Sequence, residues 1–284
     1  MTEKKSKSSG IQLIAQSLKW ALLLFLSTFG VVILFGLILG FLETKSQTYL
    51  YGAFGWAGIV VTGIIGTPIH EMAHFLMCLP FGIKVYEVSL FRPFAGRQDG
   101  ILGYVTYSRE PGNLVQTIGT LFVGIAPMIL GPLVLIILFR LLVPECYKQV
   151  KDDIGKSLSD DNITIKSVLK SSAITVKSLI VHLFHFTKKT AARNIVMLYF
   201  LLAISSHTTL SVADIVNALP GFIVIMTVYI ILGFIAAASK QDIGKDILKS
   251  ALTIAAFFMI ALVFSIFATL ISMGFFSIFG RFRI

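Results

Sequence analysis

The sequence predicts an all-α membrane protein with about six transmembrane helices and a small membrane-associated β-hairpin. Hydrophobic residues make up 56% of the chain and charged residues 13%, about half the charged fraction of a typical soluble domain. Several uncharged runs are long enough to cross a bilayer. Because so few charges cannot cover a soluble globule of this size, lipid is the better solvent for most of the chain.

The chain divides into a short basic tail, residues 1–18, and one polytopic membrane domain, residues 19–284. Spanning helices are predicted at residues 20–42, 50–81, 114–140, 194–210, 212–239 and 250–280. The third of these runs is interrupted by Gly124, Pro127, Gly131 and Pro132. Such residues predict a kinked helix that lets another backbone come close.

Two segments do not fit the pattern of spanning helices. In residues 83–108, two stretches rich in β-formers, 84–91 and 101–108, flank a Gly- and Pro-containing loop, which predicts a hairpin with a long loop. Residues 145–193 are polar and lysine-rich. Their mixture of Ile, Val and Leu with spaced lysines predicts a loop or helix lying in the membrane interface.

The net charge of +10 indicates a partner with negative charge. The basic residues lie at the ends of hydrophobic runs, so anionic headgroups of the lipid bilayer are the expected partner. The sequence has no nucleic-acid motif, and we expect no nucleic-acid partner. The distribution of basic residues places both termini in the cytoplasm and residues 145–193 outside.

The acidic residues direct attention to two positions. Of the 14 Asp and Glu residues, only Glu71 and Asp214 lie inside the predicted spans, where a carboxylate costs about 2.5–3.5 kcal/mol. His70 and His74 flank Glu71, and His207 precedes Asp214 by seven residues. A metal ion binding both clusters would offset the cost of their desolvation.

The spacing of the first cluster supports a metal site. On a helix, His70 and His74 differ by about 40° around the axis and about 6 Å along it, whereas Glu71 lies about 100° further round from His70. Both imidazoles can therefore bind one ion, while Glu71 can act on a water beside it as a general base. This is the His-Glu-x-x-His pattern of zinc peptidases. The alternative is a pair of buried histidines hydrogen-bonded to neighbouring helices.

The chain resembles the site-2 protease family of intramembrane zinc metalloproteases over roughly residues 50–240. The shared features are the motif from His70 to His74 in a transmembrane helix, a strand-forming segment just after it, and the lone Asp214 two to three spans later. The resemblance implies that His70, His74 and Asp214 bind Zn²⁺ and that Glu71 is the catalytic base. It also implies a transmembrane protein as the substrate, cleaved by hydrolysis of a peptide bond.

The chain departs from the family pattern around the third ligand. Asp214 lies in Val-Ala-Asp-Ile rather than in an Asn-Pro-Asp-Gly or Leu-Asp-Gly setting, and Gly131-Pro132 lacks the asparagine that usually follows. We also expect no PDZ-like domain, so the chain resembles a divergent, minimal member. Ser211 and Asp214 have the spacing of a helix capping box, and in that case His207 is the alternative third ligand.

Two other functions are consistent with the motif. A zinc protease acting at the membrane surface needs a glutamate ligand from a soluble helix, for which the sequence offers no good candidate. A non-catalytic metal-stabilised scaffold or transport component has no need of Glu71. We therefore expect a metalloendopeptidase in the plasma membrane of a prokaryote, with its active site near the cytoplasmic face.

We expect strand 84–91 to hold the substrate in extended form by strand addition.

Overall fold

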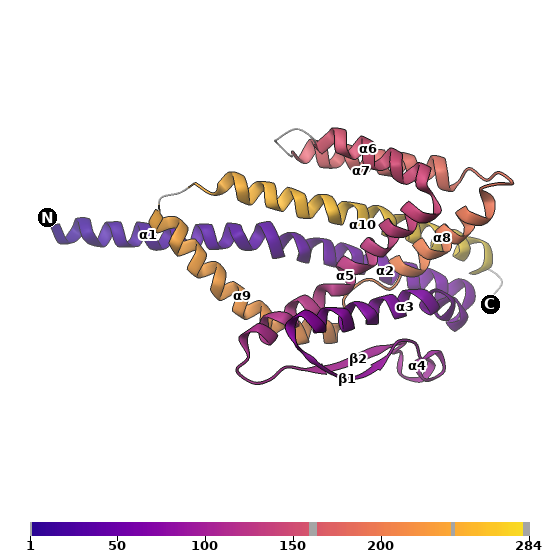
Figure 1. Ribbon diagram of the computed structural model, residues 1–284, viewed down its shortest axis with the longest axis horizontal. Coiled ribbons are helices and arrows are strands. Elements are labelled where there is room, and N and C mark those ends of the chain that lie inside the picture. Colours follow the sequence, from indigo (N-terminus) through magenta and orange to yellow (C-terminus); the bar gives the residue numbers. More distant parts are fainter. Residues whose placement is uncertain (1, 159–163, 240–241, 281–284) are drawn as a thin grey trace.

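A computed structural model describes residues 2–158, 164–239 and 242–280 of the chain. These residues form helices joined by short loops, with one two-stranded antiparallel sheet (Figure 1). Among the described residues, five helical segments are long and apolar enough to span a membrane: Gly10–Phe54, Trp56–Phe81, Leu114–Leu142, Val212–Ser239 and Gly244–Phe279. The predicted fold class, an all-α membrane protein with a small hairpin, is therefore confirmed.

The break between the first two predicted spans lies later in the chain than the sequence predicts. Helix α1 (Thr2–Phe25), a π-helical turn (Leu26–Gly30) and α2 (Val31–Phe54) follow one another as one helical rod that includes the basic tail. The rod ends at Gly55, whose φ of 65° favours glycine. The polar residues 43–48, expected to connect two spans, are instead helical. The side chains of Glu43, Ser46 and Gln47 among them bond to other parts of the protein.

The second rod carries the histidine motif. Helix α3 (Trp56–Cys78) continues into a 3₁₀ turn (Leu79–Phe81). The hairpin then follows as β1 (Lys84–Ser89), a short helix α4 (Pro93–Asp99) and β2 (Tyr104–Ser108). The strands pair in antiparallel register with an irregularity between Val85 and Glu87. The predicted hairpin is present, with shorter strands and a helical turn in its loop.

Helix α5 (Leu114–Leu142) follows the third predicted span closely. The close approach predicted from its glycines is present at Gly124, where an added Cβ would lie 2.8 Å from Ala218 Cβ and 3.0 Å from the Asp214 carbonyl oxygen. The interfacial segment contains α6 (Pro144–Leu158) and α7 (Ile165–Leu183), which pack against each other. Glycine in α5 thus lets the start of a later helix come close.

The last three helices are α8 (Ala191–Ser205), α9 (Val212–Ser239) and α10 (Gly244–Phe279). Helix α8 has 15 residues, hence a length of about 22 Å, which is short of the roughly 30 Å hydrocarbon core. The fourth predicted span, 194–210, is therefore only partly helical. The chain leaves the helix at Ser206 and begins α9 at Val212, so residues 206–211 form a loop inside the bundle.

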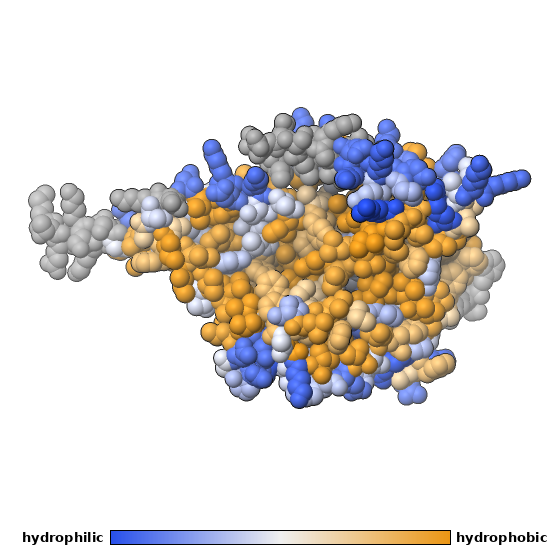
Figure 2. All heavy atoms as spheres, viewed as in Figure 1, coloured by the Kyte–Doolittle hydropathy of each residue, from blue (hydrophilic) through white to orange (hydrophobic). Residues whose placement is uncertain are grey.

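The helices pack so that the loop and the motif meet. Helix α10 lies along α2, α9 packs against α1 and α5, and α3 contacts both α5 and α8. Figure 2 shows hydrophobic side chains over the middle of the visible face, with hydrophilic ones along its upper edge, over α6 and α7, and along its lower edge, where the hairpin lies. This distribution is that of a membrane protein with two polar faces.

Candidate metal centre

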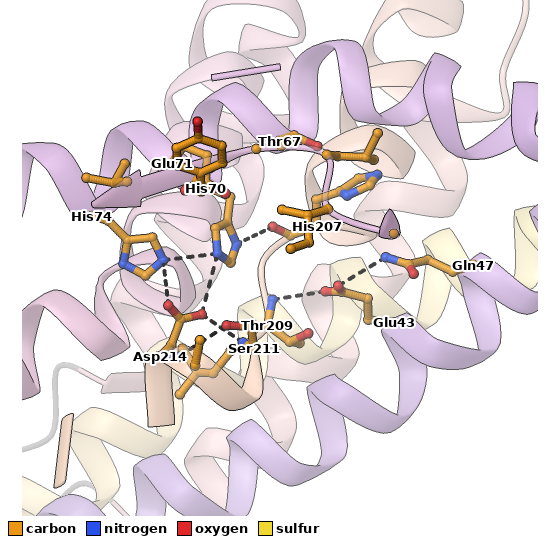
Figure 3. A pocket seen from close by; sticks show the side chains of 18 of the residues that line it. Glu43, Gln47, Thr67, His70, Glu71, His74, His207, Thr209, Ser211 and Asp214 are labelled. Atoms are coloured by element: carbon orange, nitrogen blue, oxygen red, sulfur yellow. Dashed lines mark hydrogen bonds and ion pairs between the residues drawn. The ribbon is translucent and has the colours of Figure 1, made fainter. Parts of the chain in front are cut away.

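The two motif histidines and Asp214 come together in the structure. His70 and His74 project from α3, and Asp214 lies in the first turn of α9 (Figure 3). The Nε2 atoms of the histidines are 3.1 Å apart. Asp214 Oδ1 lies 3.1 Å from His74 Nε2, and Asp214 Oδ2 lies 3.7 Å from His70 Nε2. Two clusters separated by 140 residues of sequence thus form one group of three side chains that could hold a metal ion.

The outer nitrogen of each histidine is held by a backbone carbonyl. His70 Nδ1 lies 2.8 Å from the carbonyl oxygen of His207, and His74 Nδ1 lies 2.8 Å from that of Val123. A carbonyl only accepts hydrogen bonds, so each Nδ1 carries a proton, and the Nε2 atom of each ring faces the other ring and Asp214. Two imidazole nitrogens that face each other beside a carboxylate form a donor set that could hold a metal ion.

Asp214 caps its helix and also faces the histidines, so the two roles between which the sequence left a choice are compatible. Its Oδ2 accepts a hydrogen bond of 2.8 Å from the backbone N–H of Ser211, and its own N–H donates to Ser211 Oγ at 3.1 Å. The capping box is therefore present, while Oδ1 faces His74. A carboxylate has two oxygens with several lone pairs, so capping the helix does not prevent it from facing the histidines.

His207 contributes to the centre through its backbone, and its ring points elsewhere. Its Nε2 lies 3.1 Å from Thr62 Oγ1, and the ring packs beside Gly66 of α3. An added Cβ at Gly66 would meet the Ala203 carbonyl oxygen and this ring. Glycine thus allows α3 and the loop after α8 to approach closely, which places the carbonyl of His207 on His70. Within the described residues, the group of three side chains that could hold a metal ion does not include the His207 ring.

Glu71 lies beside the three ligand candidates without joining them. The residue is 7% exposed and lines the same cavity. None of the described residues donates a hydrogen bond to its carboxylate. Its Cγ lies against Gly103, just before β2, where an added Cβ would be only 2.8 Å away. The carboxylate is therefore next to the histidines and available to a molecule in the cavity.

The cavity at the centre has a volume of about 780 Å³, in the range of ligand sites. It lies between α2, α3, the loop 206–211, the start of α9 and the strand β2. The hairpin residues that line it are Gly100, Ile101, Leu102, Gly103, Tyr104, Val105 and Tyr107. The strand next to the site is therefore β2, and the expectation that strand 84–91 lines it is wrong. None of the residues of β1 lines the cavity, whereas Tyr104, Val105 and Tyr107 of β2 do.

A smaller cavity of about 350 Å³ adjoins the first. Tyr107 of β2 and Asn217 of α9 line both. The smaller cavity continues towards Arg109 and Pro220. The two cavities together follow β2 past the ligand candidates, which is a path suited to an extended chain.

Sequence reasoning missed the polar residues of α2 at the edge of the cavity. Glu43 and Gln47 line it and bond to the loop 206–211 (Figure 3). The available signal was their spacing: Glu43, Ser46 and Gln47 are three and four residues apart, so they share one face of a helix. Hydropathy alone predicts a connector here, because the apolar runs 20–42 and 50–81 end on either side of these residues.

No protein-family model, no curated protein and no solved structure matches this chain. Its function must therefore be inferred from the site itself.

Proposed function

We propose that this chain is an intramembrane zinc metalloprotease that hydrolyses peptide bonds of membrane-protein substrates. The observation that carries the proposal is the convergence of two imidazole nitrogens and one carboxylate on one point, with a further, unbonded carboxylate beside them, at the wall of a cavity among apolar helices.

The donor set suits zinc. Imidazole nitrogen and carboxylate oxygen are common zinc ligands, and catalytic sites have three protein ligands with the fourth position open. Bonds of about 2.0–2.1 Å to a tetrahedral ion put neighbouring ligand atoms about 3.3–3.4 Å apart. His74 Nε2 lies 3.1 Å from both His70 Nε2 and Asp214 Oδ1, close to this value, and His70 Nε2 lies 3.7 Å from the second carboxylate oxygen, Oδ2. In this proposal His70, His74 and Asp214 hold the ion.

Zinc in this place would supply a Lewis acid that polarises the scissile carbonyl and makes water a better nucleophile at neutral pH. Glu71 follows His70 directly and has no bond to a ligand, so its carboxylate can take the proton of the attacking water. The same carboxylate can then give that proton to the leaving amine. The carbonyls of His207 and Val123 keep the imidazoles oriented throughout.

The cavity supports an extended segment of a transmembrane protein as the substrate. A peptide bond inside a helix is enclosed, so the substrate must unwind, and its freed backbone groups need partners in the membrane. The described residues show no third strand on the cavity side of β2, so that edge can pair with an unwound segment. We place the protein in the plasma membrane of a prokaryote with the site near the cytoplasmic face, the side on which the basic tail is expected.

The test compares wild type with Glu71→Gln after purification in detergent. Metal content is measured by mass spectrometry, and cleavage is assayed on a panel of single-span membrane proteins. Wild type should contain about one zinc ion per chain and cleave, and Glu71→Gln should retain the zinc but lose cleavage. Glu110→Gln is the matched control, because it makes the same chemical change at an exposed residue outside the cavity. Cleavage by Glu71→Gln at the wild-type rate, or a wild type without metal, would refute the proposal.

A further inference from the structure

A polar face of α2 holds the loop that joins α8 to α9. Glu43 Oε2 accepts hydrogen bonds from the backbone N–H groups of Thr208, at 3.0 Å, and Thr209, at 2.9 Å. Gln47 Nε2 donates both to Glu43 Oε1 at 3.2 Å and to the carbonyl of Ser206 at 2.8 Å. One carboxylate and one amide thus bind three residues of the loop, Ser206, Thr208 and Thr209.

One peptide unit of this loop lies between Glu43 and the metal centre. The carbonyl of His207 accepts from His70 Nδ1, and the N–H of the same peptide, that of Thr208, donates to Glu43. The peptide is trans, so its carbonyl and its N–H point in opposite directions. Glu43 and His70 therefore lie at opposite edges of one amide group and are joined through it; Figure 3 shows the contact of His70 with the carbonyl of His207.

The chemistry of this arrangement is that of a histidine ligand backed by a carboxylate. A hydrogen bond from an amide to a carboxylate is charge-assisted and stronger than a neutral one. It polarises the amide, so the carbonyl at its other end becomes a better acceptor. A stronger acceptor at Nδ1 fixes the ring and makes Nε2 a better donor to a metal. The negative charge of Glu43 is thus transmitted to His70 through an amide.

The carboxylate of Glu43 is well suited to this role by its position. Among the described residues, His74 has no equivalent support: its Nδ1 is bonded to Val123, inside α5. Glu43 itself lines the cavity of the site but is not in the metal-binding group. A residue that only anchored the loop would need no charge, since a neutral amide or hydroxyl oxygen also accepts backbone N–H groups.

We propose that Glu43 is a positioning residue that acts on the metal centre through the peptide between His207 and Thr208. It orients the His70 ring and strengthens His70 as a ligand. The inference rests on the metal site of the proposed function but not on proteolysis.

The test compares Glu43→Gln with wild type and with Thr44→Ala. Glutamine keeps the size and an acceptor oxygen but removes the charge. Thr44 is the neighbouring residue, is exposed, and bonds only within its own helix among the described contacts. Zinc affinity is measured by competition with a chelator, and the Co²⁺-substituted proteins are compared by visible absorption. Loss of a supporting residue typically weakens metal affinity about 10–100-fold, so Glu43→Gln should lower zinc affinity at least about tenfold and shift the Co²⁺ bands, while Thr44→Ala does neither.

The outcomes separate this inference from the proposed function. If wild type binds zinc and Glu43→Gln has the same affinity and the same Co²⁺ spectrum, the inference is overturned while the protease proposal stands. If wild type binds zinc but cleaves no substrate, a weakened Glu43→Gln still supports the inference. If wild type binds no metal, both fail. Should Glu43→Gln not fold, Gln47→Ala, which removes one partner of the carboxylate, should cause a smaller shift in the same direction. An unchanged affinity in Gln47→Ala would then overturn the inference.

Discussion

Replacing His207 by alanine separates the two candidates for the third ligand. In the structure His207 supports His70 with its carbonyl oxygen, at 2.8 Å, and alanine keeps that carbonyl. The substitution removes a buried ring and its 3.1 Å contact with Thr62 Oγ1. Thr62 keeps two further acceptors, the carbonyls of Gly58 and Ile59, so no hydroxyl is left unsatisfied. We expect a loss of about 2–4 kcal/mol of stability from the cavity and the hydrogen bond, with the metal still bound.

The assay measures zinc content and thermal unfolding in detergent, with and without a chelator. A bound metal stabilises the folded state by mass action. The chelator should therefore lower the unfolding temperature of wild type and of His207→Ala. It should not change the unfolding temperature of Asp214→Ala, His70→Ala or His74→Ala. Asp246→Ala is the control, since Asp246 also lies in the first turn of a helix but outside the site. Metal retained in Asp214→Ala and absent from His207→Ala would refute the reasoning and move the third ligand to His207.

Two further predictions follow from the fold. In Gly103→Ala the new Cβ would lie 2.8 Å from Glu71 Cγ and 2.9 Å from the Ser89 carbonyl oxygen. Displacement of Glu71 should lower the rate of cleavage by up to about 100-fold while the zinc content stays unchanged. Cleavage by Gly103→Ala at the wild-type rate would contradict this prediction. In a cysteine-free background, a single cysteine at Gly10 should react with an impermeant thiol reagent only from the cytoplasmic side, and one at Lys188 only from outside. Labelling at Lys188 from the cytoplasm would contradict the predicted orientation.

The sequence was most informative where apolar periodicity and cost of burial decide the structure. The span 212–239 coincides with α9, and the third span nearly coincides with α5. Glu71 and Asp214 could be singled out because a carboxylate inside an apolar run requires compensation. The four-residue spacing of His70 and His74 then predicted their common direction, which the structure shows as an Nε2–Nε2 distance of 3.1 Å.

The sequence was least informative where polar groups are satisfied by distant partners. Residues 43–48 resemble a connector because nothing local shows that Ser46 will bond to Ser206 and Ser272. For the same reason the end of α8 was placed too late. The Val123 and His207 carbonyls that hold the histidines are backbone atoms, and any residue type could supply them. No residue pattern can therefore predict these contacts.

The loop between α8 and α9 shows why stability and metal binding should be linked in this protein. Backbone groups away from water must be paired within the protein. The N–H groups of Thr208 and Thr209 donate to Glu43, that of Ser211 donates to Asp214, and the carbonyl of His207 accepts from His70. Three residues that form hydrogen bonds with the loop backbone are thus His70 and Asp214, which are ligand candidates, and Glu43, which is proposed to support His70. The non-helical loop can persist inside the protein because side chains of the site form hydrogen bonds with its backbone groups. The same hydrogen bonds keep the side chains of the site in place.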